Sequence, residues 1–232
     1  MLSRFLSSRK SKECDQFALR SQQTWAKAKE AGIFDLEIAP VEVKTRKGTQ
    51  IVDTDEHPRP STTLEQLAKL PTVFDKNGVV TAAGSSGICD GAGAIVVASE
   101  AAVKEHNLTP LCRLVSYGVV GCDPSIMGIG PVPAIQQALA KAGLTLANVD
   151  RIEINEAVAA QFLACAKELD LDMEKTNLHG GAISLGHPLG ASGSRITAHL
   201  AHEFAQNSSS KIHVGAACIG GGQGIALVLE RV

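Results

Sequence analysis

The chain has 232 residues, a formal net charge of −2 and only 3% aromatic residues. Because both charge signs are spread along the chain, we expect no nucleic-acid partner. No apolar run approaches the roughly 20 residues of a membrane span, so we expect no integral membrane segment. The length suffices for a buried core in one large or two small domains, and the dominance of small aliphatic residues favours an α/β fold.

The first twelve residues carry four basic residues, four serines and no acid. This composition predicts either a short mitochondrial targeting peptide or a disordered segment over residues 1–12. Six cysteines are scattered along the chain without a Cys-x-x-Cys pair. In a chain of this length they indicate reduced thiols, with neither a disulfide framework nor a metal site.

Residues 13–84 are interpreted as a loop-rich lid domain. An apolar stripe predicts a helix over residues 14–31, and alternating side chains predict a strand over residues 41–44. Thr62 and Glu65 have the spacing of a capping box ahead of a short helix. Farther on, the apolar run 94–98 is typical of a strand buried on both faces, and a short helix follows at residues 101–106.

From residue 111 strands and helices alternate regularly, which predicts a layered α/β domain over residues 111–232. The expected strands are 111–117, 151–154, 212–217 and 225–229, and the last two form a hairpin. The expected helices are 134–142, 157–169 and one that begins at Ser192 or Ser194.

Three segments of this domain place reactive side chains where strands or loops end. Asn155 lies where a strand gives way to a helix, and His187 lies in a glycine-dense loop. Cys218 precedes a glycine run whose backbone N–H groups could face an anion. Singly, these residues are explained by helix capping, a hydrogen-bonded turn and packing. Together and in this order they are much more specific.

Asn155-Glu156-Ala157, Gly186-His187-Pro188-Leu189-Gly190 and Cys218-Ile219-Gly220-Gly221-Gly222-Gln223-Gly224 resemble the three C-terminal motifs of the thiolases. The resemblance extends from about residue 12 to residue 232. It implies a thiolase-like layered α-β-α fold with a complete C-terminal half over residues 111–232. Residues 85–110 would be a remnant of the N-terminal domain, most of which we expect to be missing.

The resemblance implies thiolysis of a 3-ketoacyl-CoA by coenzyme A, which yields acetyl-CoA and a shortened acyl-CoA in fatty acid β-oxidation. His187 would lower the pKa of a nucleophilic cysteine and donate to the thioester oxygen, helped by a water that Asn155 holds. Cys218 would protonate the acetyl-CoA carbanion and later deprotonate coenzyme A. The N–H of Gly220 would contribute to a second oxyanion hole.

By the same resemblance, Arg59, Thr62 and Ser86 match positions that contact coenzyme A, which is a substrate and not a tightly bound cofactor. A homo-oligomer, either a dimer or a tetramer, and a mitochondrial location are also implied.

Two features depart from the family pattern. The family's nucleophile lies in a Cys-x-Ser-Gly segment, and no such segment occurs in the 232 residues. Cys89 is a poor replacement for this nucleophile, because it stands beside Asp90, whose charge should raise the pKa of the thiol. Val158 follows Asn-Glu-Ala where the family usually has Phe, and we expect a looser acyl pocket. We therefore expect the chain as given to be inactive as a thiolase.

Two other functions stay open. The chain could be a non-catalytic module that binds coenzyme A or an intact thiolase subunit. A metal hydrolase that uses His199 and His202 has less support, because helical spacing supplies these two ligands but no obvious third.

Overall fold

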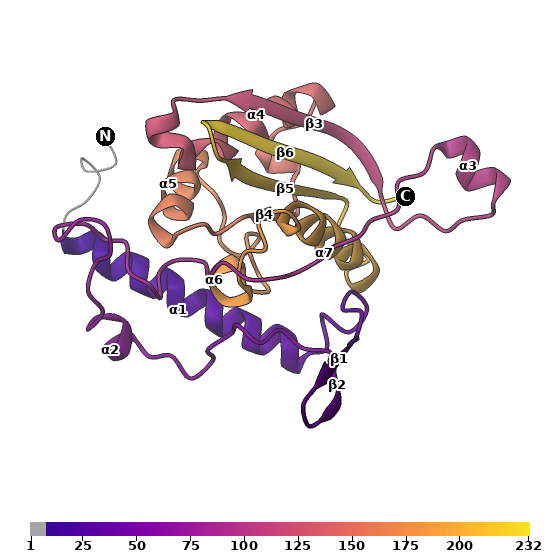
Figure 1. The fold of residues 1–232 in the computed structure, drawn as a ribbon. Helices are drawn as coiled ribbons and strands as arrows, with labels where there is room; N and C mark the ends of the chain where they lie inside the picture. The colour runs from indigo at the N-terminus through magenta and orange to yellow at the C-terminus, as the bar shows by residue number, and fades with distance from the viewer. Residues whose placement is uncertain (1–7) are drawn as a thin grey trace.

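The structure is a computed structural model that describes residues 8–232 (Figure 1). Its centre is a four-stranded sheet in the order β3-β6-β5-β4. The strands are β3 (Arg113–Gly121), β4 (Arg151–Ile154), β5 (Ile212–Ile219) and β6 (Gln223–Glu230). β6 pairs antiparallel with β3 and β5, whereas β4 pairs parallel with β5. These strands confirm the predicted α/β class and the predicted hairpin.

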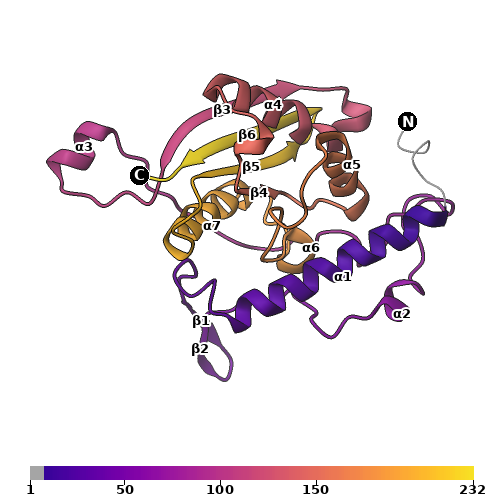
Figure 2. The ribbon, with the colours of Figure 1, turned by 180° about the vertical axis from the view of Figure 1, so that it is seen from behind.

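Helices cover both faces of the sheet (Figures 1 and 2). α4 (Pro131–Ala142) and α5 (Ala159–Leu169) share the larger core, and α7 (Ser192–Gln206) packs on the opposite face. Successive residues of β5 point to opposite faces of the sheet, so one strand contacts both layers of helices. Val214 joins the larger core, while the neighbouring Gly215 faces Ile196 and Leu200 of α7.

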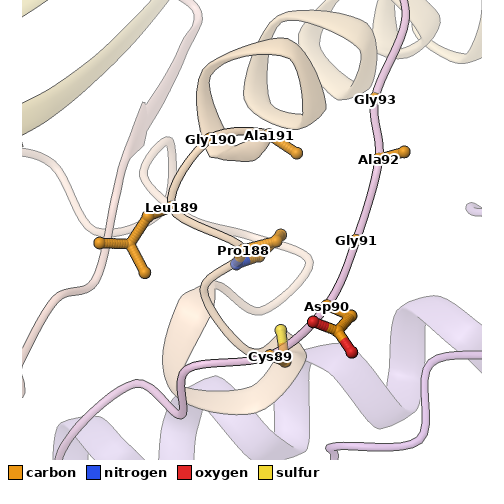
Figure 3. A pocket seen from close by; sticks show the side chains of 9 residues that line it. All are labelled: Cys89, Asp90, Gly91, Ala92, Gly93, Pro188, Leu189, Gly190 and Ala191. Atoms are coloured by element: carbon orange, nitrogen blue, oxygen red, sulfur yellow. The ribbon is translucent and has the colours of Figure 1, made fainter.

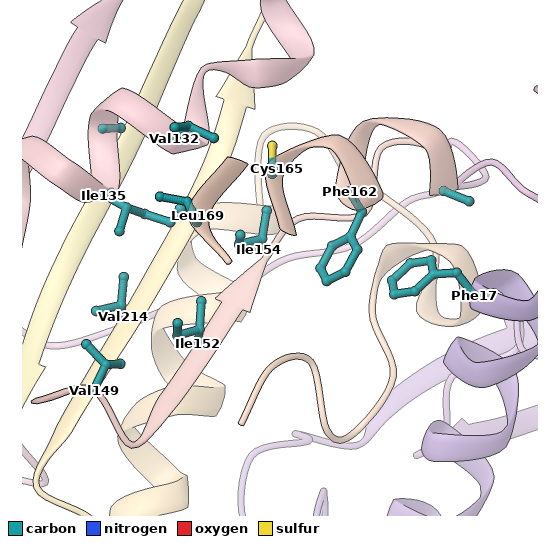
Figure 4. Close-up of a cluster of buried hydrophobic side chains, with 14 of the residues drawn as sticks. Phe17, Val132, Ile135, Val149, Ile152, Ile154, Phe162, Cys165, Leu169 and Val214 are labelled. Carbon is teal, nitrogen blue, oxygen red and sulfur yellow. The ribbon is translucent and has the colours of Figure 1, made fainter. Parts of the chain in front are cut away.

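The larger core extends from the sheet to the long helix α1 (Ser8–Glu30), as Figure 4 shows. Phe162 of α5 is fully buried and stacks on Phe17 of α1, with ring centroids 4.1 Å apart. α1 begins earlier than the predicted residue 14, so residues 8–12 of the proposed targeting or disordered segment are helical. Residues 1–7 of that segment lie outside the described residues.

The predicted lid contains a two-stranded hairpin and a single-turn helix. The hairpin consists of β1 (Val41–Thr45) and β2 (Gly48–Val52), and the helix is α2 (Leu64–Leu67). The predicted cap at Thr62 is wrong by one residue. Thr63 accepts from the Gln66 N–H in a capping box, while the Thr62 hydroxyl donates to the Arg59 carbonyl at 2.7 Å.

The predicted strand over residues 94–98 is wrong. These residues belong to no strand, and the exposed fractions of Val96 and Val97 are 92% and 78%. The run is apolar enough for a buried strand, but no other segment within residues 8–232 offers it a ladder of hydrogen bonds. It continues into α3 (Glu100–Glu105), close to the short helix predicted there.

The remaining short elements are the 3-10 turns η2 (Pro124–Ile129) and η3 (Leu146–Asn148), and the helix α6 (Ala182–Leu185). Among the described residues, none of the helices has both the length and the apolar composition needed to span a bilayer.

Candidate active site

The parallel pairing of β4 with β5 brings two of the predicted site segments to the same edge of the sheet. Asn155 follows β4 directly, and its backbone N–H donates to the Ala216 carbonyl of β5 at 2.9 Å. Cys218 lies two residues beyond Ala216 and pairs with Gly224 of β6. Because parallel strands end at the same edge, the Asn-Glu-Ala motif and the Cys218 motif are neighbours.

His187 reaches Asn155 from the glycine-dense loop between α6 and α7. Its Nε2 lies 3.4 Å from Asn155 Nδ2, and its Nδ1 lies 2.6 Å from the Ser192 hydroxyl. The backbone N–H of His187 donates to the Gly87 carbonyl at 2.7 Å, which fixes the loop against residues 85–88. Thus the Asn155 and His187 motifs, which are 32 residues apart in the sequence, share one site.

The contacts of His187 favour one tautomer. The Ser192 hydroxyl has a single hydrogen and also lies 3.2 Å from the Pro188 carbonyl. When Ser192 donates there, Nδ1–H of His187 donates to Ser192 and Nε2 keeps its lone pair. Burial, and then the Arg195 charge, lowers the pKa of His187, so the neutral imidazole is favoured near pH 7. The histidine can therefore accept a proton at Nε2.

The Asn155 side chain has an unused acceptor. It is 1% exposed, and its Oδ1 is buried without a hydrogen-bond partner among the described residues. A buried polar atom of this kind is costly unless a water or ligand satisfies it. An orphaned acceptor beside His187 Nε2 is the feature that a water-holding asparagine needs.

Glu156 is a residue of the site that the sequence did not single out for a role. It is fully buried and accepts from Ser21 Oγ at 2.7 Å, Asn177 Nδ2 at 3.0 Å and the Ile183 N–H at 3.2 Å. Burial raises the pKa of this carboxyl. Its donors come from α1, from the loop that follows α5, and from α6, so Glu156 ties together the elements that carry the His187 loop. The feature of the sequence that could have indicated this role is the place of Glu156 in the motif, between Asn155 and Ala157.

Cys218 is the last residue but one of β5, and Gly220 begins the turn that leads to β6. Burial raises the pKa of the Cys218 thiol, so the protonated form is favoured near neutral pH. Gly222 has a φ of +85°, and a Cβ there would lie 2.9 Å from Pro124 Cγ. This close approach holds the turn against the start of η2. No hydrogen bond among the described residues joins Cys218 to His187 or Asn155.

The three expected coenzyme A contacts lie on two adjoining segments. Ser86 donates its hydroxyl to the Ala157 carbonyl at 3.0 Å, next to the Asn-Glu-Ala motif. Thr62 is hydrogen-bonded to Arg59, whose exposed guanidinium donates to three carbonyls of its own loop. The His57 ring packs against Gly87 and brings this loop beside Ser86.

Cys89 is a thiol close to the His187 loop (Figure 3). It borders a surface cavity of about 350 Å³ between residues 89–93 and 188–191. A Cβ at Gly186 would lie 2.6 Å from Cys89 Sγ, which requires glycine there. Burial raises the pKa of Cys89, and the Asp90 charge acts in the expected direction. These conditions disfavour the thiolate that a nucleophile needs.

The metal-hydrolase pair expected from the sequence does not form a site. Among the described residues, the His, Cys, Asp and Glu side chains close enough to share an ion are His179, His199 and Glu203. His202 is not in this group.

Comparison with known proteins identifies the family. The family model for the thiolase C-terminal domain matches residues 108–231, and that for the thiolase N-terminal domain matches residues 2–101. The chain belongs to the thiolase family.

Individual relatives agree with this assignment. The chain is 64% identical over 94% of its length to the mitochondrial 3-ketoacyl-CoA thiolase of Pongo abelii, and 52% identical over 94% to an acetyl-CoA acetyltransferase of Escherichia coli. It covers 55% of each of these relatives. A crystal structure of human mitochondrial 3-ketoacyl-CoA thiolase in complex with CoA has a TM-score of 0.92 and 61% identity; the match covers 96% of this chain and 55% of that one. The chain thus spans about half the length of the relatives that it matches.

Proposed function

We propose that this chain supplies the proton-transfer part of a thiolase site, which cleaves a 3-ketoacyl-CoA with coenzyme A to acetyl-CoA and a shortened acyl-CoA. The observation that carries the proposal is the meeting of His187 Nε2 with Asn155, 3.4 Å apart, beside the buried and unpartnered Asn155 Oδ1. Once Nε2 has accepted the proton of the nucleophilic cysteine, the imidazolium N–H and a held water together can stabilise the negative oxygen of an acetyl thioester enolate.

The steps of this reaction divide between His187 and Cys218. His187 accepts the proton of the nucleophilic cysteine, which then attacks the 3-keto carbon and forms a thioester. The bond between C2 and C3 breaks, and the thiol of Cys218 gives its proton to the acetyl-CoA carbanion. Its thiolate then takes the proton of the incoming coenzyme A, whose sulfur attacks the acyl thioester. The nucleophilic cysteine leaves and takes back its proton from His187. Because burial raises the pKa of Cys218, its thiol is protonated when the carbanion forms and can give up that proton.

Coenzyme A is proposed as a substrate held near Arg59, Thr62 and Ser86, without a tightly bound cofactor. The human relative solved in complex with CoA supports this proposal. The relatives named as mitochondrial enzymes support a mitochondrial location and fatty acid β-oxidation. We further propose a homo-oligomer, either a dimer or a tetramer.

The test joins the chain to the N-terminal portion of the mitochondrial relative, which supplies a Cys-x-Ser-Gly segment. We expect no thiolysis by the chain alone and measurable thiolysis of acetoacetyl-CoA by the fusion. His187→Ala in the fusion should prevent labelling by acetyl-CoA and lower turnover by about 10²–10⁴-fold. Cys218→Ser should keep the labelling and lose thiolysis, while Cys112→Ser serves as the matched thiol control. Equal loss of labelling in both site variants would contradict this division of roles.

The same fusion tests Asn155. Asn155→Ala should lower kcat by about 10²-fold and leave KM nearly unchanged, because an oxyanion contact acts mainly in the transition state. A rise in KM at constant kcat would instead assign Asn155 to substrate binding.

A second candidate function is a non-catalytic module that associates with a thiolase subunit. The exposed apolar run at residues 95–97 favours association with a partner. Size-exclusion chromatography of the chain with and without the full-length relative separates the two functions. A stable complex without activity in the fusion would favour the module.

A further inference from the structure

A buried polar cluster lies outside the proposed active site, where α7 meets the loop before α6. His199 and Glu203 are four residues apart on α7 and therefore project from the same face of the helix. His179 approaches them from the loop. Its Nδ1 lies 3.0 Å from His199 Nε2 and 3.5 Å from Glu203 Oε1. The thiolysis steps above use none of these three residues.

The distances fit a shared metal ion. A tetrahedral Zn²⁺ with ligands at about 2.0–2.1 Å holds its ligand atoms about 3.3 Å apart. The two observed separations, 3.0 and 3.5 Å, lie on either side of that value, and all three ligand atoms lie within 4.8 Å of one another. Two imidazoles and a carboxylate form a donor set that suits zinc and its neighbours in the first transition row.

Glu37 supplies a second, independent observation. Both of its carboxylate oxygens lie 3.0 Å from His199 Nδ1, the ring nitrogen that faces away from the cluster. The side chains of His199 and Glu37 are only 5% and 12% exposed. A histidine that binds a metal commonly donates its other N–H to a carboxylate, which fixes the tautomer and aims the free nitrogen at the ion. His199 has this arrangement, with Nε2 aimed at His179.

We propose that His179 Nδ1, His199 Nε2 and Glu203 Oε1 bind a divalent transition-metal ion of the Zn²⁺ type, with Glu37 orienting His199. Arg151 Nε lies 3.4 Å from the same Glu203 oxygen and shares that carboxylate with the ion. The positive charge of Arg151 lowers the affinity of the site for the metal ion, so we expect the ion to be removable by a chelator. The ion joins α7 to the loop before α6 and to the segment after α1, and its role is structural.

The test uses the full chain with Zn²⁺ and Co²⁺ as probes. The cobalt spectrum should show nitrogen and oxygen ligation without the near-ultraviolet bands of thiolate ligands. Zn²⁺ should displace Co²⁺ and raise Tm, because an ion that binds only the folded state stabilises it. A chelator should reverse the shift. Thiolate bands, or no change in Tm, would overturn the proposal, and this measurement needs no variant.

Variants then locate the site. Glu37→Gln should weaken Zn²⁺ binding by about 10–100-fold, and His179→Gln by at least as much. His202→Gln is the matched control, because it removes a half-buried histidine of the same helix that lies outside the cluster, and it should leave the affinity within about twofold. Circular dichroism confirms folding. Undiminished affinity in a folded His179→Gln chain would also overturn the proposal.

Discussion

β5 and the run at residues 94–98 are similarly apolar, yet they end in opposite environments. Val214 of β5 is fully buried, because β4 and β6 pair with its strand and helices cover both faces of the sheet. Val96 is 92% exposed and belongs to no strand. The difference is one of partners and not of composition. An apolar run is a buried strand only where other chain segments satisfy its backbone and cover its side chains.

The outer part of the sheet shows the same effect on a smaller scale. β3 is an edge strand, and Tyr117, Val119 and Ile225 on the face that it shares with β6 are 59%, 49% and 40% exposed. α7 covers the face beneath β5 but leaves these residues uncovered. Exposed apolar surface is therefore found both on the segment before residue 111 and on the part of the sheet that β3 contributes.

The largest expected effect comes from breaking the well-packed region. Phe162→Ala should lower the free energy of unfolding by about 3–5 kcal/mol, because it leaves a cavity where the ring stacks on Phe17. Val96→Ala should change it by less than about 0.5 kcal/mol, since the side chain is already in water. Chemical denaturation measures both. A loss above about 2 kcal/mol for Val96→Ala would show that this run is packed in solution.

Lowering the pH also tests the buried region, through His213, and the expected effect on stability is smaller. This ring is fully buried, stacks on Phe204, and is hydrogen-bonded to Ser210 and the Leu200 carbonyl. Burial lowers the pKa of His213 from 6.5 to about 4. Between these values the unfolded chain binds a proton that the folded chain does not, so stability falls as the pH drops from 6.5 towards 4.

The slope from His213 is at most about 1.4 kcal/mol per pH unit. His213→Gln should reduce the number of protons taken up on unfolding near pH 5 by about one. Urea unfolding at several pH values measures this number. An unchanged slope in His213→Gln would show that the histidine is already charged in the folded chain.

The sequence predicted most of the C-terminal domain and failed where the outcome depended on distant contacts. Residues 151–154 were predicted as a strand with the observed bounds, and the helix predicted over residues 134–142 ends at the same residue as α4. The motifs predicted Asn155 and His187 as site residues, and their meeting follows from the fold. No local pattern could reveal that Ser21, 135 residues away, donates to Glu156, or that His179 meets His199. The scattered cysteines that led us to expect no metal site gave no information on histidines brought together by folding.

The smallest expected effect on stability concerns the exposed run itself, through Val96→Lys. Since Val96 is 92% exposed and makes no strand pairing, a charged side chain there should change the free energy of unfolding by less than about 0.5 kcal/mol. The same change should raise solubility, because a lysine in a short apolar extended segment opposes edge-to-edge pairing between chains. Light scattering over time at several protein concentrations measures association, and Glu105→Gln, which changes the net charge by the same single unit in the neighbouring helix α3, controls for net charge. If both variants reduce scattering equally, net charge and not the apolar run drives association. If Val96→Lys destabilises the chain, the run must pack against another surface in solution, and its contrast with β5 would be one of degree.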